Sequence, residues 1–204
     1  LEPVQGEGGI NVAPPGYLKA VRELCDEHNL LLIFDEVQVG CGRTGKLFAY
    51  QHDDVAPDIM TLAKAMAGGA PIGAMVATEK AAAAFTPGSH GSTFGGNPLV
   101  TAAALATMDV LENEGVLENC VEMGDYLRKS LEQLSTRYNF CGEVRGRGLI
   151  LGLQLDIDGA PLVTSALKRG LLINCTAGKV LRFVPPLTVN KGEIDHSMEI
   201  LDQV

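Results

Sequence analysis

The first hundred residues of the chain alternate between short apolar runs and segments with helical spacing. Residues 30–35, "LLLIFD", form a continuous apolar run, the pattern of a strand buried on both faces of a parallel sheet. Residues 58–63 and 72–77 predict two more short strands, and residues 14–29 have the apolar spacing of a helix. Strands that alternate with helices in this way favour a parallel α/β layer.

The second half of the chain has a different pattern. A helical pattern starts near Asn97 and continues to about Tyr138, with a break predicted near Gly115. The elements expected after it are a strand pair from residue 140, a helix at 160–170, two strands joined at Ala177-Gly178, and a helix capped by Asn190 and Glu193. We therefore expect two domains, residues 1–115 and a small α+β domain at residues 116–204.

The overall charge and the cysteine and histidine spacing exclude several kinds of partner. A net charge of −9 gives no basic surface for nucleic acid or an anionic membrane, and no apolar run approaches the length of a bilayer span. Five cysteines without a C-x-x-C pair indicate a reduced, cytoplasmic setting, and the histidines lack metal-ligand spacing. The chain opens at Leu1 without Met, inside what looks like a strand end and a glycine-rich loop, so we expect a fragment.

Lys64 is the one cation in the stretch "TLAKAMAGGAPIGAMVA", residues 61–77. Removing a charge from water is costly unless the charge is paired or neutralised. One interpretation is that the Lys64 side chain reaches solvent at the end of a strand or helix. The other is that its amine has a lowered pKa and takes part in chemistry.

Two motifs in residues 40–46, "GCGRTGK", suggest phosphate binding but lack their required context. The pattern G-x-G-x-x-G holds a dinucleotide only when a helix follows it. Here the chain has room for only about two helical turns after the motif, before a loop rich in Asp begins. The pattern G-x-x-x-x-G-K needs Ser or Thr next, and Leu47 stands there instead. Neither a dinucleotide site nor an ATPase site is favoured.

A third candidate for phosphate binding is the loop "GSHGSTFGGNP", residues 88–98. The hydroxyls of Ser92 and Thr93 lie among glycines, just ahead of a helix that starts near Asn97, where an anion is stabilised. The alternative is a flexible Gly/Ser loop without a ligand. Combined with Asp35 at a strand end and Lys64 after a second strand, this loop suggests pyridoxal phosphate. That cofactor needs an amine, a carboxylate for its pyridine nitrogen and donors for its phosphate.

The segments "FDEVQVGCGRTG", "TLAKAMAGGAPIGA" and "GSTFGGNP" resemble the class III, ornithine-type aminotransferases. The resemblance covers the whole chain, and "LLINCTAGKVLRFVPPLTV" is most similar to the acetylornithine subgroup. It implies the fold of a fold type I pyridoxal-phosphate-dependent transferase. The chain would then be the C-terminal half, with part of the large parallel-sheet domain and the small C-terminal domain. The family's phosphate-binding glycine loop, ring-stacking aromatic and carboxylate-binding arginine would lie before Leu1.

The resemblance also implies a role for each cofactor residue. Lys64 would form the Schiff base with the cofactor and move the proton, and Asp35 would pair with the pyridinium. Val37 and Gln38 would contact the ring and its 3-oxygen. Thr93, with Ser92 beside it, would reach the phosphate of the partner in a homodimer. The neighbouring Glu36 is expected to support structure.

Glu7 and Arg182 match a switchable pair in the substrate pocket of the family. An arginine masked by a glutamate is unmasked when the second substrate brings an extra carboxylate. The alternative is an ordinary buried ion pair.

The expected function is transfer of an amino group from N-acetylornithine to 2-oxoglutarate, in arginine biosynthesis. Succinylornithine, succinyl-diaminopimelate, ornithine and 4-aminobutyrate are alternative donors, because a pocket gains only about 1–3 kcal/mol per methylene in distinguishing them. A second hypothesis is an inactive dimerising fragment that holds the cofactor poorly.

Overall fold

The computed structural model describes residues 1–204 as two compact units. The first comprises Leu1–Pro3, Ala13–Gly42 and Lys46–Gly115, and the second comprises Val4–Val12, Arg43–Gly45 and Val116–Val204. The second unit therefore includes two short segments from the first 45 residues, which no sequence signal had indicated. None of the helices has both the length and the apolar character needed to cross a membrane.

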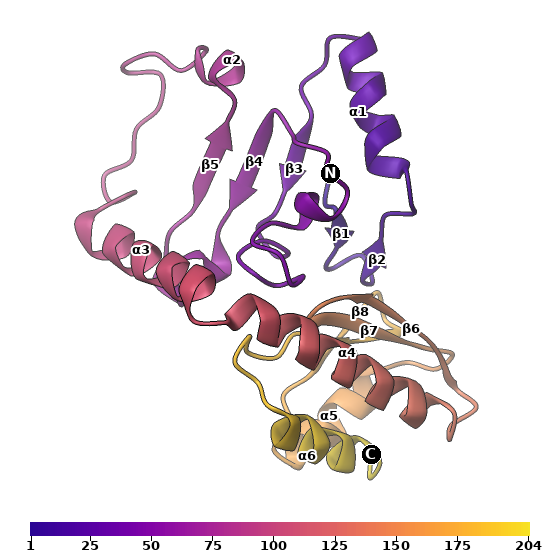
Figure 1. Ribbon diagram of the computed structural model, residues 1–204. Coiled ribbons are helices and arrows are strands. Elements are labelled where there is room, and N and C mark those ends of the chain that lie inside the picture. Colours follow the sequence, from indigo (N-terminus) through magenta and orange to yellow (C-terminus); the bar gives the residue numbers. More distant parts are fainter. The chain divides into compact units, whose positions relative to one another are not determined.

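The first unit contains a three-stranded sheet accompanied by helices (Figure 1). The strands are β3 (Ile33–Asp35), β4 (Ile59–Leu62) and β5 (Ala74–Ala77), in that order across the sheet. The helices are α1 (Tyr17–Glu27), α2 (Glu79–Ala82) and α3 (Pro98–Asn113), with 3-10 turns η1 (Ala49–His52) and η2 (Lys64–Ala67). The α/β class predicted for this part of the chain is confirmed.

The sheet of the first unit is mixed rather than parallel. β3 runs parallel to β4, as predicted, but β5 runs antiparallel to β4, so the predicted parallel layer is wrong for the second pair. A parallel crossover needs about a dozen residues or more and usually contains a helix. Residues 63–73, which join β4 to β5, contain only the short η2, and the chain turns back beside β4.

The two faces of β3 differ in burial, contrary to the prediction that both would be buried. Phe34 is fully buried in a cluster with Leu18 and Cys25 of α1, whereas Ile33 remains 43% exposed. Leu30 and Leu31 precede the strand and are exposed as well. Because successive side chains of a strand point to opposite faces, α1 covers only the face that carries Phe34. The other face carries Asp35.

The helical pattern predicted from Asn97 onward is broken at Gly115, as expected. The side chain of Asn97 accepts hydrogen bonds from Leu99 N and Val100 N, and caps α3. Gly115 then adopts φ = 71°, a left-handed conformation that glycine tolerates without a steric penalty, and α4 (Val116–Ser135) begins.

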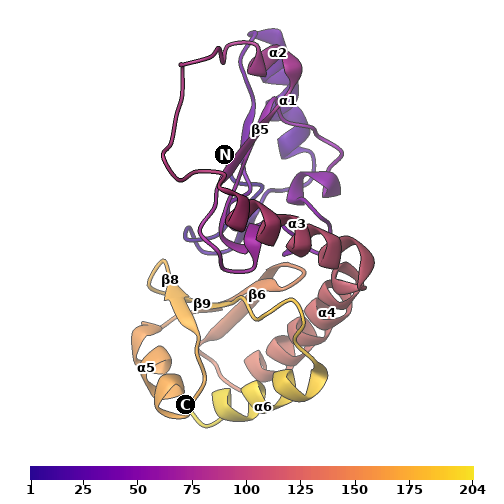
Figure 2. The ribbon, with the colours of Figure 1, turned by 90° about the vertical axis from the view of Figure 1, so that its left-hand side faces the viewer.

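The second unit is a four-stranded antiparallel sheet with helices on one face (Figure 2). Its order is β6 (Cys141–Arg147), β7 (Ile150–Leu155), β9 (Val180–Phe183) and β8 (Asn174–Thr176). The core lies between the sheet and the helices α4, α5 (Ala160–Lys168) and α6 (Lys191–Leu201). A short hairpin, β1 (Val4–Gln5) with β2 (Asn11–Val12), also belongs to this unit.

The local signals predicted for residues 140–204 are confirmed. Ala177 and Gly178 form the turn between β8 and β9, with φ of 49° and 71°. Asn190 and Glu193 form the predicted capping box at the start of α6. The second unit has the expected α+β arrangement.

Two glycines allow α4 to approach the turn between β6 and β7 at backbone distance. A Cβ atom added to Gly124 would lie 2.5 Å from the carbonyl oxygen of Gly148. A Cβ on Gly148, where φ is 55°, would lie 2.6 Å from the carbonyl carbon of Thr44. Three backbone segments therefore pack here without intervening side chains.

We expect Gly124→Ala to destabilise the protein by about 1–3 kcal/mol, because the backbone at Gly148 must shift. This loss opposes the gain of about 1 kcal/mol that alanine brings to a helix interior. Gly142→Ala is the control, since its Cβ would lie 3.7 Å from Gln154, in ordinary contact. Urea unfolding of both variants measures the difference, and equal stabilities would contradict the packing argument.

Candidate functional site

Asp35 lies at the carboxyl end of β3, on the uncovered face of the sheet. It stands opposite Thr61 of β4 in the parallel register. Its Oδ1 accepts a hydrogen bond from Val37 N at 3.0 Å and one from Thr61 Oγ1 at 3.3 Å. Oδ2 has no hydrogen-bond partner in the chain, so this exposed carboxylate is fixed in orientation and has one oxygen left to accept.

Lys64 follows β4 by two residues and opens η2. Its side chain is exposed, and the chain offers its amine no hydrogen bond or ion pair. Its φ is +45°, a left-handed value that costs a residue with a side chain about 1–3 kcal/mol. Strained backbone conformations of this kind are found most often at functional sites. Because β3 and β4 are parallel, Asp35 and Lys64 both follow strand ends at one edge of the sheet, where ligands of α/β proteins bind.

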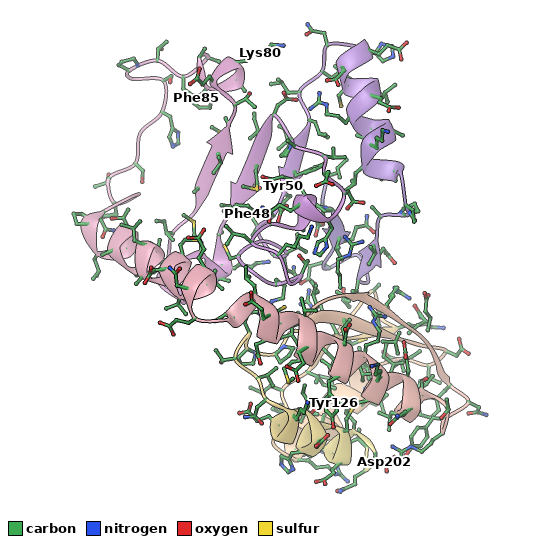
Figure 3. The ribbon with its side chains drawn as sticks, viewed as in Figure 1. Phe48, Tyr50, Lys80, Phe85, Tyr126 and Asp202 are labelled. Atoms are coloured by element: carbon green, nitrogen blue, oxygen red, sulfur yellow. The ribbon has the colours of Figure 1, made fainter.

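Glu36 joins the end of β3 to η1. It is 1% exposed, and its two carboxylate oxygens accept from Ala49 N at 2.7 Å and Tyr50 N at 2.8 Å. Removal from water raises the pKa of the Glu36 carboxyl group, and the two backbone donors partly oppose this rise. Figure 3 shows Tyr50 beside Phe48, and their rings stack with centroids 6.0 Å apart. These contacts support the structural role expected for Glu36.

Val37 and Gln38 are half-buried in the turns that follow β3. The glycine motif at residues 40–46 lies in turns as well, and the next helical element is the four-residue η1. No helix of useful length begins there, which agrees with the rejection of a dinucleotide or ATPase loop.

Ser92 and Thr93 lie in an exposed loop ahead of α3. The Ser92 hydroxyl accepts from Gly95 N at 2.9 Å, a local turn that orders the loop. Thr93 makes no hydrogen bond in the chain. The parallel strands bring Asp35 and Lys64 to one edge of the sheet, and no hydrogen bond links the Ser92–Thr93 loop to either of them.

Glu7 and Arg182 form an ion pair within the second unit. Arg182 Nη1 lies 2.5 Å from Glu7 Oε1, and Arg182 Nε donates to Asn174 Oδ1 at 3.0 Å. The Arg182 side chain is 11% exposed and that of Glu7 73% exposed, so the alternative of an ordinary buried ion pair does not describe the Glu7 side.

Three polar residues that the sequence reasoning missed hold this pair in place. Asn174 faces Arg182 across the β8–β9 pair, and the Thr176 hydroxyl donates to the carbonyl of Glu7. Arg145 Nε donates to Gly9 O at 2.9 Å and so holds the main chain of the β1–β2 turn in position. The sequence gives one signal for these residues: along β6 and β8, polar residues alternate with apolar residues that pack in the core.

Arg182 and Asn174 also belong to the lining of a cavity of about 600 Å³ in the second unit, most of whose other lining residues are apolar. This volume lies within the usual range of small-molecule sites.

The whole chain, residues 1–204, matches the family described as aminotransferase class III. It is 55% identical over 204 residues to acetylornithine aminotransferase of Methanocaldococcus jannaschii, and 48% identical over 205 residues to ornithine aminotransferase 2 of Staphylococcus aureus strain Mu50. Each match covers 100% of this chain and 51% of the relative. The chain therefore spans about half the length of the curated relatives it matches.

Among solved structures, the chain is similar to ornithine aminotransferase from Toxoplasma gondii, crystallised with oxidised glutathione. The TM-score is 0.93 at 40% identity, covering 100% of this chain and 49% of that one. That structure is described as having partial occupancy of PLP, pyridoxal phosphate, at its active site.

The raised pKa of Glu36 predicts a pH dependence of folding. A carboxyl whose pKa is higher in the folded protein than its ordinary 4.5 contributes most to stability below 4.5. That contribution is lost as the pH rises through the folded-state pKa. The unfolding free energy of the wild type should therefore fall relative to that of Glu36→Gln as the pH rises from 4.5. Urea titrations at several pH values test this, and parallel curves would show that Glu36 titrates normally.

Proposed function

The chain belongs to the class III aminotransferases, as its motifs predicted, and from this premise we propose that it forms the catalytic half of an N-acetylornithine aminotransferase. Amino-group transfer from N-acetylornithine to 2-oxoglutarate is the activity proposed. Four relatives that carry the name acetylornithine aminotransferase, at 50–55% identity, support this choice of donor. The observation that carries the proposal is the strained, unpartnered Lys64 beside the Asp35 edge of the sheet.

The residues of the first unit fit pyridoxal phosphate, the cofactor of this family. Lys64 offers an exposed amine without a partner, and Asp35 offers one carboxylate oxygen that accepts nothing from the chain. The uncovered face of the sheet lies beside both residues, and the small residues that follow Lys64 leave the backbone open to a flat ring. We propose that Lys64 holds the cofactor covalently and that Asp35 accepts from its pyridine nitrogen.

The proposed mechanism assigns one task to each side chain. When bound, pyridoxal phosphate carries the amino group and withdraws electrons from the substrate Cα. Lys64 Nζ takes the proton from that Cα and delivers it on the cofactor side, as a general base and then a general acid. The carboxylate of Asp35 would hold the proton on the pyridine nitrogen. Val37 and Gln38 orient the ring, and Ser92 and Thr93 bind the phosphate of the partner subunit.

Glu7 and Arg182 are proposed to select between the two substrates. With Glu7 in place, the charge of Arg182 is compensated and the pair accepts a donor without a second carboxylate. When Glu7 moves aside, Arg182 is available to the second carboxylate of 2-oxoglutarate. The 73% exposure of the Glu7 side chain supports this, because the carboxylate that has to leave Arg182 already reaches solvent.

The proposal also covers the identity of the amino donor and the cellular compartment. Ornithine is the alternative donor with direct support, since a relative at 48% identity is named ornithine aminotransferase 2. Comparing kcat/KM for N-acetylornithine, succinylornithine and ornithine distinguishes these candidates.

A cytoplasmic, reducing compartment is proposed as well, and five free cysteines support it. The rival hypothesis, an inactive dimerising fragment, predicts that the protein does not retain the cofactor.

Covalent capture of the cofactor tests Lys64. After incubation with pyridoxal phosphate and reduction with borohydride, the peptide containing Lys64 should carry the cofactor mass. Lys64→Ala should abolish this adduct and lower the rate of transamination by at least about 10²–10⁴-fold, because a general base is lost. Lys80→Ala, in the exposed helix α2 (Figure 3), is the control and should behave as the wild type. An adduct on any other lysine, or none on the wild type, would contradict the proposal.

Sharing of the site between subunits gives a separate test. Light scattering should show a dimer, and Thr93→Ala should weaken pyridoxal phosphate binding about tenfold or more, through loss of a hydrogen bond to a charged phosphate. Ser89→Ala in the same loop is the control, because the Ser89 hydroxyl bonds only to Thr86. A cofactor-loaded monomer, or unchanged affinity in Thr93→Ala, would contradict the shared site.

A further inference from the structure

Two of the partners of the Arg182 guanidinium group are of different kinds. Nη1 lies 2.5 Å from the carboxylate of Glu7, and Nε donates to the amide oxygen of Asn174 at 3.0 Å. Glu7 is charged and its side chain is 73% exposed. Asn174 is neutral and half-buried in the sheet.

The two partners also differ in how the fold holds them. Asn174 is paired with Arg182 in the register of the antiparallel strands β8 and β9, so their side chains share one face of the sheet. Glu7 lies in the turn between β1 and β2, and Thr176 holds its main-chain carbonyl but not its side chain. The Glu7 side chain can therefore rotate away while its backbone stays in place. Asn174 is half-buried and lies within the sheet, directly beside Arg182.

We propose that Asn174 is a positioning residue that keeps Arg182 in place when Glu7 leaves it, and thereby sets the affinity for the dicarboxylic amino acceptor. This inference rests on the proposed function and extends it. The hydrogen bond from Arg182 Nε to Asn174 fixes the direction of the guanidinium group after Glu7 has left, which reduces the entropy lost when a carboxylate binds.

The neutrality of Asn174 matters as much as its position. An amide oxygen accepts from Nε without cancelling the positive charge, so the full charge remains for an incoming carboxylate. An aspartate at the same position would orient Arg182 equally well but would compensate its charge permanently. The two effects, orientation and charge, are therefore separable by substitution.

The test uses Asn174→Ala and Asn174→Asp in the cofactor-loaded protein, with each half-reaction followed by the absorbance of the cofactor. Asn174→Ala should raise the concentration of 2-oxoglutarate that gives half-maximal rate about ten- to a hundredfold, the value of a hydrogen bond to a charged group. Asn174→Asp should raise it as well, although the acceptor oxygen is retained. The half-reaction with N-acetylornithine should change less than about threefold in either variant, since it does not need the uncovered charge.

Direct binding of glutarate, a dicarboxylate without a keto group, measured by calorimetry, gives a readout that does not depend on turnover. Its dissociation constant should rise in parallel with the constant for 2-oxoglutarate. Cys175→Ala is the matched control, because Cys175 lies in the same strand but packs into the core on the other face. This control should leave both half-reactions and the glutarate constant unchanged.

The outcomes separate this inference from the proposed function. Equal slowing of both half-reactions, which simple loss of structure would cause, overturns the positioning role, as does wild-type affinity for glutarate in both variants. A wild-type protein that reacts with neither N-acetylornithine nor 2-oxoglutarate overturns the proposed function itself. In Glu7→Gln, where Arg182 lacks its charged partner throughout, Asn174→Ala should still weaken glutarate binding. Its failure to do so would also contradict the inference.

Discussion

The parallel pairing of β3 with β4 is the constraint on which the candidate site depends. It sets Asp35 opposite Thr61 and lets Glu36 N donate to Thr61 O at 3.0 Å, so that both strands end at the same edge. A register shift of one residue would turn Asp35 towards the covered face that holds Phe34. Hydrogen bonds from Val37 and Thr61 then fix the carboxylate. This pairing places the two sequence motifs that contain Asp35 and Lys64 at the same edge of the sheet.

The backbone around Lys64 is built from conformations that ordinary residues avoid. Lys64 has φ = 45°, and Gly68 and Gly69 have φ of 60° and 109°. A left-handed lysine costs about 1–3 kcal/mol, and it persists only where the surrounding structure demands it. Since the Lys64 amine makes no internal hydrogen bond or ion pair in return, this strain is better explained by the direction it gives the amine than by stability.

The second unit builds its pair from residues that lie 175 positions apart, Glu7 and Arg182. Gly152 makes this possible, because a Cβ there would lie 3.0 Å from Ile10 and push the β1–β2 turn off the sheet. Arg145 and Thr176 then bind the main chain of that turn. The ion pair therefore rests on neutral and backbone contacts, which leaves the Glu7 side chain free to move.

Local features were predictable, because each depends on residues within about four positions of one another. The Asn190–Glu193 capping box, the Ala177–Gly178 turn and the break at Gly115 all follow from such short-range chemistry. The motifs around Asp35 and Lys64 were readable for the same reason, and they led to the correct family. The antiparallel course of β5, the exposure of Ile33 and the contact of Asn174 with Arg182 were decided only by the tertiary structure. Each of these depends on which distant segment lies alongside, and no local pattern encodes that.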